Sequence, residues 1–256
     1  MRDLFAATSA GRIHCRATGD GPPLFLMHSN GRSAHEFDPL ATALADRFTI
    51  MSWDMPGQGD SDRLTRHFQV ADYVAILLEV VDALCSAPPI IAGSSIGAVF
   101  ALAAAAEHPD RFAGCIPIEL PMTRDGGWWA DHWPMVERMF AVPDETPEQV
   151  AGRFRAVPAD LALRLRMDRH KAGGWTMIDV LWAGRDDADA TLDRIRSLRV
   201  PTLFLNGIRG VAPDAALLLP TLNPRVQLEI IGDSGHFPQT DDPTATAAAI
   251  LRHFGG

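Results

Sequence analysis

A glycine-flanked serine near the middle of the chain, Gly93-Ser94-Ser95-Ile96-Gly97, constrains the fold more than any other feature. The apolar run Pro89–Ala92 precedes it and the alanine-rich stretch Ala98–Glu107 follows it, which predicts a strand, a sharp turn and a helix. Glycines two residues either side of the serine allow close packing in such a turn. The hydroxyl of Ser95 is then exposed, and the amide of Ile96 lies at a helix N-terminus, where it can stabilise an oxyanion. Since this pattern also occurs by chance, the prediction depends on the flanking strand and helix.

Composition and charge exclude several classes of protein. A chain of 256 residues can bury one large core, and 47% hydrophobic with 21% charged residues is typical of a globular protein. The net charge of −9 argues against nucleic acid and anionic membranes as partners. Three scattered cysteines predict neither a disulfide framework nor a zinc site. With no signal pattern and no uncharged apolar run of ~18 residues, we expect a cytoplasmic protein, either a monomer or a homodimer.

Apolar runs alternate with helical patterns along most of the chain, which predicts an α/β fold with a mainly parallel sheet. Several runs are continuously apolar, as expected for parallel strands that are buried on both faces. The predicted strands are Arg12–Ala17, Leu24–His28, Thr49–Trp53, Ile90–Ala92, Gly114–Glu119, Thr202–Asn206 and Val226–Ile231. The predicted helices are Phe37–Asp46, Ala71–Cys85, Ile96–His108, Pro213–Leu219 and Thr244–His253.

The strand signal stops between about Met122 and Arg199, where tryptophan, methionine and arginine become dense. Glycine pairs and prolines divide this stretch into short helices. We therefore expect a core domain of residues 1–121 and 200–256, and a helical cap of residues 122–199 over the carboxyl ends of the strands, where open α/β sheets bind ligands. Tryptophans in the cap form either its own core or the wall of a substrate pocket. Candidates for the pocket are Met122, Trp128 and, outside the cap, Phe237.

The loop after the last predicted strand supplies a candidate general base. A serine nucleophile is weak at neutral pH and needs an adjacent base. The strand Val226–Ile231 is followed by Gly232-Asp233-Ser234-Gly235-His236-Phe237-Pro238, which places His236 at the strand end. The other eight histidines lie in an early strand, in other loops or helices, or at helix ends, where a dipole contact is the usual role. We predict that His236 is the base.

An oxyanion hole needs a second backbone amide besides that of Ile96. The first predicted parallel strand leads into His28-Ser29-Asn30-Gly31, and the N–H of Asn30 is the candidate. Ser29 is a less suitable nucleophile than Ser95 because it lacks the flanking glycines. No metal or organic cofactor is needed for chemistry of this kind.

The acid that orients the histidine is not fixed by the sequence. The loop Gly207–Pro213 after a predicted strand contains no carboxylate, and Asp214 behind it reads as the first turn of a helix. Glu119 ends the apolar strand next to that of the serine turn, so it belongs at the same edge of the sheet. It can either accept Nδ1–H of His236 or pair with an arginine such as Arg124. We favour Glu119 as the acid; Asp214, or no acid at all, remain alternatives.

With these residues in place, the whole chain resembles the α/β-hydrolases. This resemblance implies a mostly parallel eight-stranded sheet flanked by helices, with a helical cap inserted after the sixth strand. Most members carry the acid in a Gly-x-x-Asp loop, where this chain has Gly207-Ile208-Arg209-Gly210, and His-Gly where it has His28-Ser29.

More specifically, the chain resembles the fungal zearalenone lactonases. The matching segments are Asp54-Met55-Pro56-Gly57, Ser94-Ser95, Pro117-Ile118-Glu119-Leu120-Pro121 and His236-Phe237-Pro238. In that family the triad acid is the glutamate of the Pro-x-Glu-Leu-Pro segment, which implies Glu119 here. A tryptophan of the family's cap contacts the substrate, and Trp182 is its possible counterpart. Haloalkane dehalogenases share the layout but use aspartate as nucleophile, which Ser95 argues against.

These observations predict a serine hydrolase that cleaves an apolar ester or lactone, with zearalenone as one possible substrate. Hydrolysis of a carbon–carbon bond by the same triad is the alternative within enzymes. A ligand-binding or signalling relative with poor turnover is the alternative outside them, and the empty Gly-x-x-Asp position is its best support.

Overall fold

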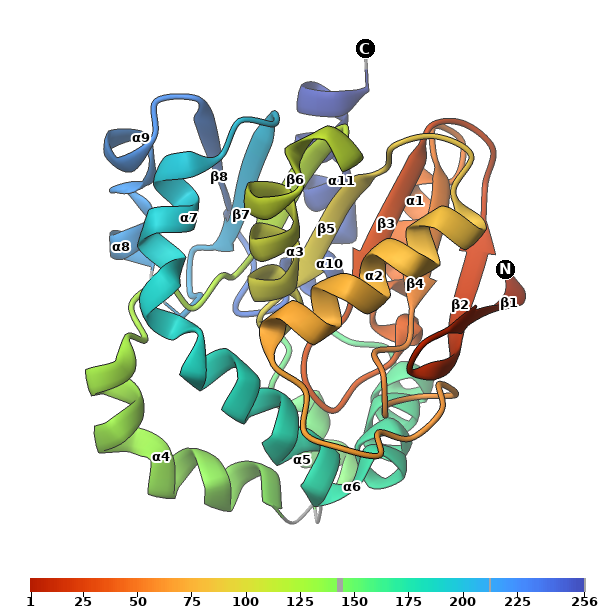
Figure 1. Cartoon of the computed structure of the whole chain (residues 1–256), viewed down its shortest axis with the longest axis vertical. Coiled ribbons are helices and arrows are strands. Elements are labelled where there is room, and N and C mark those ends of the chain that lie inside the picture. The colour runs from red at the N-terminus through yellow and green to blue at the C-terminus, as the bar shows by residue number, and fades with distance from the viewer. Residues whose placement is uncertain (142–144, 212, 256) are drawn as a thin grey trace.

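The strands form one sheet of eight through the middle of the molecule (Figure 1). The computed structural model describes residues 1–141, 145–211 and 213–255. The strand order is β1-β2-β4-β3-β5-β6-β7-β8; β2 is antiparallel to both neighbours and all other pairs are parallel. The strands are β1 (Arg2–Thr8), β2 (Gly11–Thr18), β3 (Pro23–Met27), β4 (Thr49–Trp53), β5 (Ile90–Ser94), β6 (Gly114–Ile118), β7 (Thr202–Gly207) and β8 (Val226–Ile231). The predicted α/β class is confirmed.

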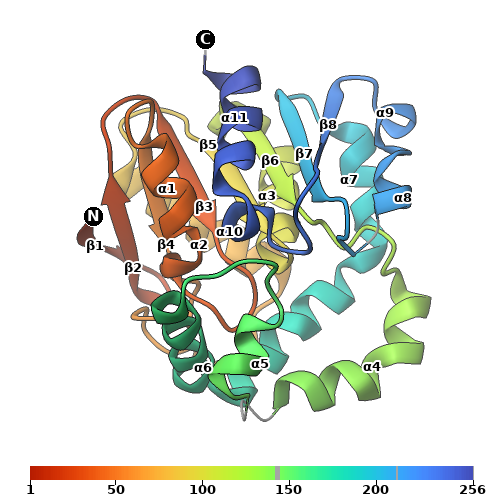
Figure 2. The same cartoon turned by 180° about the vertical axis from the view of Figure 1, so that it is seen from behind.

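Helices cover both faces of this sheet. Figure 1 shows α2, α3 and α7 in front of it, and Figure 2 shows α1 and α11 over the opposite face. Each face has its own apolar cluster; in β3, Phe25 packs into one while Leu24 and Leu26 pack into the other. The helices are α1 (Asp38–Leu44), α2 (Val70–Leu84), α3 (Ile96–Glu107), α4 (Gly126–Ala141), α5 (Pro147–Ala151), α6 (Ala159–Asp186), α7 (Thr191–Ser197), α8 (Pro213–Ala216), α9 (Leu219–Leu222), α10 (Pro238–Asp241) and α11 (Pro243–Phe254), with 3-10 turns η1 (Ala34–Phe37), η2 (Pro109–Arg111) and η3 (Ala188–Ala190).

Two local elements differ from the sequence prediction. Strand β1 was not predicted because it is an edge strand in which only Ala6 is fully buried, so its hydrophobic pattern is weak. The helix predicted over Pro213–Leu219 is wrong: α8 ends at Ala216 and α9 begins at Leu219. Pro220 explains the second start, because proline has no N–H for a continuing helix and suits the first turn of a new one.

The serine turn between β5 and α3 is closely packed on both sides. A Cβ added to Gly93 would lie 2.0 Å from the carbonyl oxygen of Gly97, and one added to Gly97 would lie 2.3 Å from that of Met27. Both glycines are therefore required by space. Ser95 itself has a φ of 56°, a left-handed conformation that is costly for a residue with a side chain. The predicted strand, sharp turn and helix are all present.

The chain between β6 and β7 contains α4, α5, α6 and α7, and its described residues include no strand. Helices α4 to α6 lie below the sheet in Figures 1 and 2, at the carboxyl ends of the parallel strands. The helical cap after the sixth strand is thus present, while the division into domains at residues 122 and 199 stays a prediction. Helix α6 is interrupted at Gly173, whose φ is 77°.

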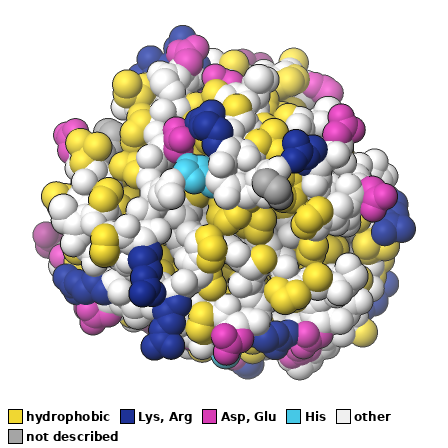
Figure 3. All heavy atoms as spheres, turned by 90° about the horizontal axis from the view of Figure 1, so that it is seen from above, with side chains coloured by type: hydrophobic (Ala, Val, Ile, Leu, Met, Phe, Trp, Pro, Cys, Tyr) yellow, Lys and Arg dark blue, Asp and Glu magenta, His cyan; other side chains and the backbone are white. Residues whose placement is uncertain are grey.

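None of the described helices is both long enough and apolar enough to cross a membrane. The face in Figure 3 carries acidic and basic side chains at scattered positions among apolar ones. The expectations of cytoplasmic location, of a monomer or homodimer and of no nucleic-acid or membrane partner remain predictions.

A buried ion pair joins the antiparallel side of the sheet to the loop after β4. His14 Nδ1 lies 2.8 Å from a carboxylate oxygen of Asp54, and His14 Nε2 lies 3.0 Å from one of Asp3. Burial lowers the pKa of His14, but the carboxylates of Asp54, Asp3 and Asp60 outweigh it and the pKa is raised. Burial raises the pKa of Asp54, but His14, His28 and backbone amides outweigh it and the pKa is lowered. Both shifts favour the charged pair.

This pair predicts a specific pH dependence of stability. Because the pKa of His14 is raised on folding, its contribution is complete below the unfolded value of about 6.5 and is lost as pH rises through the folded value. Asp54 does not contribute to the loss of stability at rising pH, because its pKa is lowered and it therefore changes protonation only at acid pH. The free energy of unfolding should therefore fall more between about pH 6 and pH 9 in the wild type than in His14→Gln, measured by urea unfolding. Parallel curves for the two proteins would contradict the assignment.

Candidate active site

Three of the predicted site residues follow parallel strands at the same edge of the sheet. Ser95 follows β5, Glu119 follows β6 and His236 lies in the loop after β8. Strands β5 and β6 are neighbours, so the first two residues are held side by side. His236 Nδ1 lies 3.2 Å from a carboxylate oxygen of Glu119, and Ser95 and His236 line one cavity. The fold thus brings together the three residues that the sequence predicts as nucleophile, base and acid.

The backbone around Ser95 aims its side chain away from the sheet. Its N–H donates to the carbonyl of Ile118 over 2.9 Å, which ties the turn to the end of β6. The left-handed φ then turns the chain sharply into α3. The Ser95 side chain is half-buried rather than buried, so the hydroxyl is accessible from the cavity.

Glu119 is a fully buried carboxylate held by backbone amides. Its Oε1 accepts from the N–H of Gly207 and its Oε2 from the N–H of Val211, both over 2.7 Å. The third partner is His236, through Oε2. Like Ser95, Glu119 has a left-handed backbone, with a φ of 51°. These contacts satisfy the oxygens of a buried carboxylate and position it to accept a hydrogen bond from the imidazole.

The absence of a carboxylate from the loop after β7 has a steric explanation. A Cβ added to Gly210 would lie 1.9 Å from Glu119 Oε1 and 2.5 Å from its Oε2. The carboxylate of Glu119 therefore fills the space that a side chain at position 210 would need. Asp214, the alternative acid, is exposed on α8. Among the described residues no ion pair joins Glu119 to Arg124, so the structural role considered for this glutamate is not observed.

Glu119 also determines how His236 presents its other ring nitrogen. A carboxylate accepts from Nδ1–H, so Nδ1 carries the proton and Nε2 is left as the basic nitrogen. The ring is half-buried and packs edge-on against Phe237, with centroids 4.7 Å apart. Phe237 in turn packs on Phe154 at 4.7 Å. His236 is thus fixed in tautomer by its acid and in orientation by an aromatic neighbour.

The loop of residues 28–33, here called the oxyanion loop, lies beside the serine. The N–H groups of Asn30 and Ile96 make no hydrogen bond to any residue that the structure describes, which leaves both able to donate to a substrate oxygen. The side chain of Asn30 donates to the carbonyl of Met177 over 2.9 Å, and the N–H of Gly31 donates to the side chain of Gln58 over 2.8 Å. These contacts hold the loop from both sides.

Ser29 and Glu36 anchor the back of the same loop. The Ser29 N–H lies 3.3 Å from the fully buried carboxylate of Glu36, and the Ser29 hydroxyl donates to that carboxylate through a short hydrogen bond. Gln239 donates both to Glu36 over 3.0 Å and to Ser94 over 2.9 Å. Ser29 is therefore engaged as an anchor rather than free as a nucleophile, and its hydroxyl gives the departure from His-Gly a physical reason.

A cavity of about 420 Å³ opens onto Ser95. Trp128 and Phe237 line it as placed by the sequence prediction, whereas Met122 and Trp182 lie outside its lining. Successive residues of a helix point about 100° apart, so Leu181 faces the cavity while Trp182 faces outward and stacks on Trp133 at 6.2 Å. The lining residues are Ser29, Asn30, Arg32, Ser95, Arg124, Trp128, Trp129, Met135, Val136, Met139, Phe140, Arg153, Leu181, Val211, His236 and Phe237.

Three arginines in this lining were not predicted. Arg124 and Arg153 come from the stretch whose density of arginine is visible in the sequence, and Arg32 follows the oxyanion amide by two residues. Sequence pattern alone gives no signal that they converge, because they lie on three separate segments.

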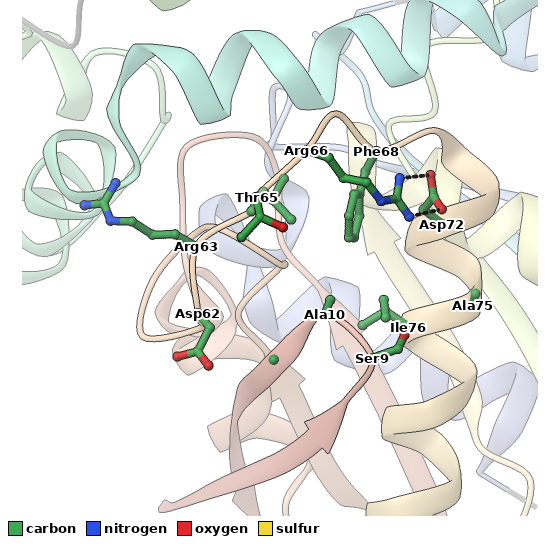
Figure 4. Close-up of a pocket in the computed structure, with 12 residues that line it drawn as sticks. Ser9, Ala10, Asp62, Arg63, Thr65, Arg66, Phe68, Asp72, Ala75 and Ile76 are labelled. Carbon is green, nitrogen blue, oxygen red and sulfur yellow. Dashed lines mark hydrogen bonds and ion pairs between the residues drawn. The ribbon is translucent and has the colours of Figure 1, made fainter.

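Two other features lie away from this cavity. Figure 4 shows a hollow of about 410 Å³ between the β1–β2 turn, the loop before α2 and α2 itself, where Arg66 and Asp72 pair with each other. None of the predicted site residues lines it. His14, Asp54 and Asp60 have ligand atoms within 4.8 Å of one another, but hydrogen bonds among themselves and an ion pair from Asp60 to Lys171 account for this spacing.

Comparison with known proteins identifies similar chains. The family model for the alpha/beta hydrolase fold matches residues 22–135. The pimeloyl-[acyl-carrier protein] methyl ester esterase of Stenotrophomonas maltophilia is 30% identical, over 94% of this chain and 96% of its own length. Haloalkane dehalogenase 2 of Mycobacterium bovis is 27% identical, over 97% of this chain and 93% of its own length. The crystal structure of E-2-(acetamidomethylene)succinate hydrolase superposes with a TM-score of 0.81 at 22% identity, covering 100% of this chain and 99% of the other.

The contact between Gly210 and Glu119 predicts that Gly210→Ala destabilises the protein. The added methyl group overlaps a carboxylate that backbone amides hold in place, and overpacking of this kind costs about 1–3 kcal/mol. Gly232→Ala is the matched control, because a Cβ there meets nothing within 4 Å. Urea unfolding of both variants measures the difference. Equal stability of the two variants would show that Glu119 is not held as described.

Proposed function

The chain belongs to the α/β-hydrolase family, and we propose that it is a serine hydrolase that cleaves a carboxylic ester or lactone. The observation that carries this proposal is the hydrogen bond of His236 to the buried carboxylate of Glu119, at a cavity that Ser95 also lines. This arrangement supplies the nucleophile, the base and the orienting acid that acyl transfer needs.

The reaction begins with attack of Ser95 Oγ on the substrate carbonyl as His236 Nε2 takes the hydroxyl proton. The N–H groups of Asn30 and Ile96 stabilise the tetrahedral oxyanion. As the intermediate collapses, the carbon–oxygen bond to the leaving alkoxide breaks and His236 returns its proton to that oxygen. Water, deprotonated by His236, then hydrolyses the acyl-enzyme and restores Ser95. Glu119 stabilises the imidazolium in both halves of the reaction.

The nature of the nucleophile favours esters over halides. The haloalkane dehalogenase shares the family, but dehalogenases use aspartate where this chain has Ser95. The esterase among the relatives supports acyl chemistry, although its own substrate does not transfer to this chain. Zearalenone is a candidate substrate because of the Pro-Ile-Glu-Leu-Pro segment around Glu119 and the apolar wall that includes Trp128 and Phe237.

Substitution of the three proposed catalytic residues tests this function. Hydrolysis of a 4-nitrophenyl ester and of zearalenone should fall by about 10³-fold or more in Ser95→Ala and His236→Gln, and by about 10²- to 10⁴-fold in Glu119→Gln. Asp214→Asn, which changes an exposed carboxylate, should retain activity. Initial rates measured on folded variants decide between the two acids. Full activity of Glu119→Gln would remove this glutamate from the mechanism.

A double variant separates an acid role from a structural one. Glu119→Ala empties the space beside Gly210, and Gly210→Asp then places a carboxylate where most α/β-hydrolases have one. Partial recovery of activity in the double variant over Glu119→Ala is expected if the carboxylate acts through His236.

The same assays distinguish the alternative functions. If wild type hydrolyses neither the 4-nitrophenyl ester nor zearalenone but cleaves a carbon–carbon bond of a diketone, carbon–carbon hydrolysis takes precedence. A ligand that binds tightly and stays unchanged would instead support a binding protein.

A further inference from the structure

The cavity beside Ser95 has a strong imbalance of charge. Three of its lining residues are arginines, Arg32, Arg124 and Arg153, and among the described residues no aspartate or glutamate lines it. The chain as a whole has a net charge of −9, so the local excess of positive charge in this cavity is opposite in sign to the charge of the whole protein. A cavity with apolar walls and unbalanced cations favours an anionic ligand.

Only one of these arginines forms an ion pair with a carboxylate of the described chain. Arg153 pairs with Glu145. Arg124 has no ion pair or hydrogen bond with any described residue; its guanidinium stacks over Trp128, 4.5 Å from the ring centroid. Arg32 is 1% exposed and likewise lacks an ion pair within the described residues. Its contacts there are a 3.4 Å hydrogen bond to the carbonyl of Leu165 and the face of Phe154.

The pKa values of Arg32 and Arg124 differ from those of ordinary surface arginines. Burial lowers the pKa of Arg32 to about 10 and also lowers the pKa of Arg124. Both remain charged at neutral pH. At Arg32 the nearby carboxylates of Glu36 and Glu145 oppose this effect of burial, whereas no carboxylate does so at Arg124. A half-buried charge without an ion pair is costly, and a substrate carboxylate at Arg124 would reduce that cost. Stacking on an aromatic ring accounts for packing of the arginine but leaves the in-plane N–H groups available to an acceptor.

We propose that this hydrolase prefers substrates that carry a carboxylate besides the scissile acyl group over uncharged candidates such as zearalenone, and that this carboxylate binds the guanidinium of Arg124. Arg32 adds to the positive potential of the same cavity. The planar fork of a guanidinium matches a carboxylate in a bidentate pair, which fixes the substrate's orientation as well as its charge. The inference rests on the proposed function, because it names the class of ester that the serine would attack.

Two esters that differ at one end test this inference. The mono-4-nitrophenyl ester of glutaric acid has a carboxylate where 4-nitrophenyl pentanoate has a methyl group. Wild type should hydrolyse the glutarate ester with a kcat/KM at least about 10-fold higher, since a charge-assisted hydrogen bond contributes roughly that factor. Rates are corrected with Ser95→Ala, which accounts for spontaneous hydrolysis.

The variant Arg124→Gln should lose about 10- to 100-fold more kcat/KM on the glutarate ester than on the pentanoate ester, mainly through KM. Arg63→Gln is the control, because Arg63 is exposed and lines the separate hollow of Figure 4. It should leave both rates unchanged. Equal losses on the two esters in Arg124→Gln, or a wild-type preference for pentanoate, would overturn the proposal.

A binding measurement keeps this test independent of catalysis. Glutarate should bind Ser95→Ala in calorimetry, and the added substitution Arg124→Gln should weaken that binding by about 10-fold or more. If no ester is hydrolysed but this difference is found, the catalytic proposal fails and the carboxylate site stands. If esters are hydrolysed and glutarate binds both proteins equally or neither of them, the carboxylate site fails and the catalytic proposal stands.

Discussion

The buried carboxylate of Glu119 is the group on which the rest of the site depends. Two backbone amides, of Gly207 and Val211, hold its oxygens, and His236 contacts one of the same oxygens. A carboxylate without exposure is tolerated only when its lone pairs are satisfied, and here the end of β7 and its following loop satisfy them. The same loop can make these contacts only because Gly210 has no side chain in that space. The position of this carboxylate thus accounts both for the hydrogen bond of His236 Nδ1 and for the glycine at position 210.

The proposed acid and the proposed nucleophile share the same backbone conformation at the ends of adjacent strands. Ser95 and Glu119 are the two non-glycine residues with left-handed φ in the described chain, at 56° and 51°. Each one's N–H donates to the neighbouring strand, Ser95 to Ile118 and Glu119 to Leu205, both over 2.9 Å. Strained conformations of this kind persist only where the surrounding structure holds them. The parallel sheet supplies that support, since its hydrogen bonds continue past the formal end of each strand.

The sequence predicted the parts of this arrangement that depend on local pattern. The serine turn could be read from its two glycines, and the placement of Glu119 and His236 followed from strand ends that share one edge of the sheet. Features that depend on long-range packing could not be read. The reason for Gly210 appears only when Glu119 occupies its neighbourhood, and the side of α6 on which Trp182 lies depends on how the cap packs. The convergence of Arg32 with Arg124 likewise requires the tertiary fold.

The contacts of the oxyanion loop give the helical cap a part in the active-site geometry beyond covering it. Within α6, Met177 accepts from the side chain of Asn30, Leu165 accepts from Arg32, and Asp168 accepts from the Ser33 hydroxyl over 2.5 Å. The donors Asn30, Arg32 and Ser33 all lie in the loop of residues 28–33, which carries the proposed oxyanion amide. The three contacts lie on both sides of the interruption at Gly173, so both parts of α6 would have to move away from the sheet to release that segment. The position of α6 and the conformation of residues 30–33 are therefore coupled.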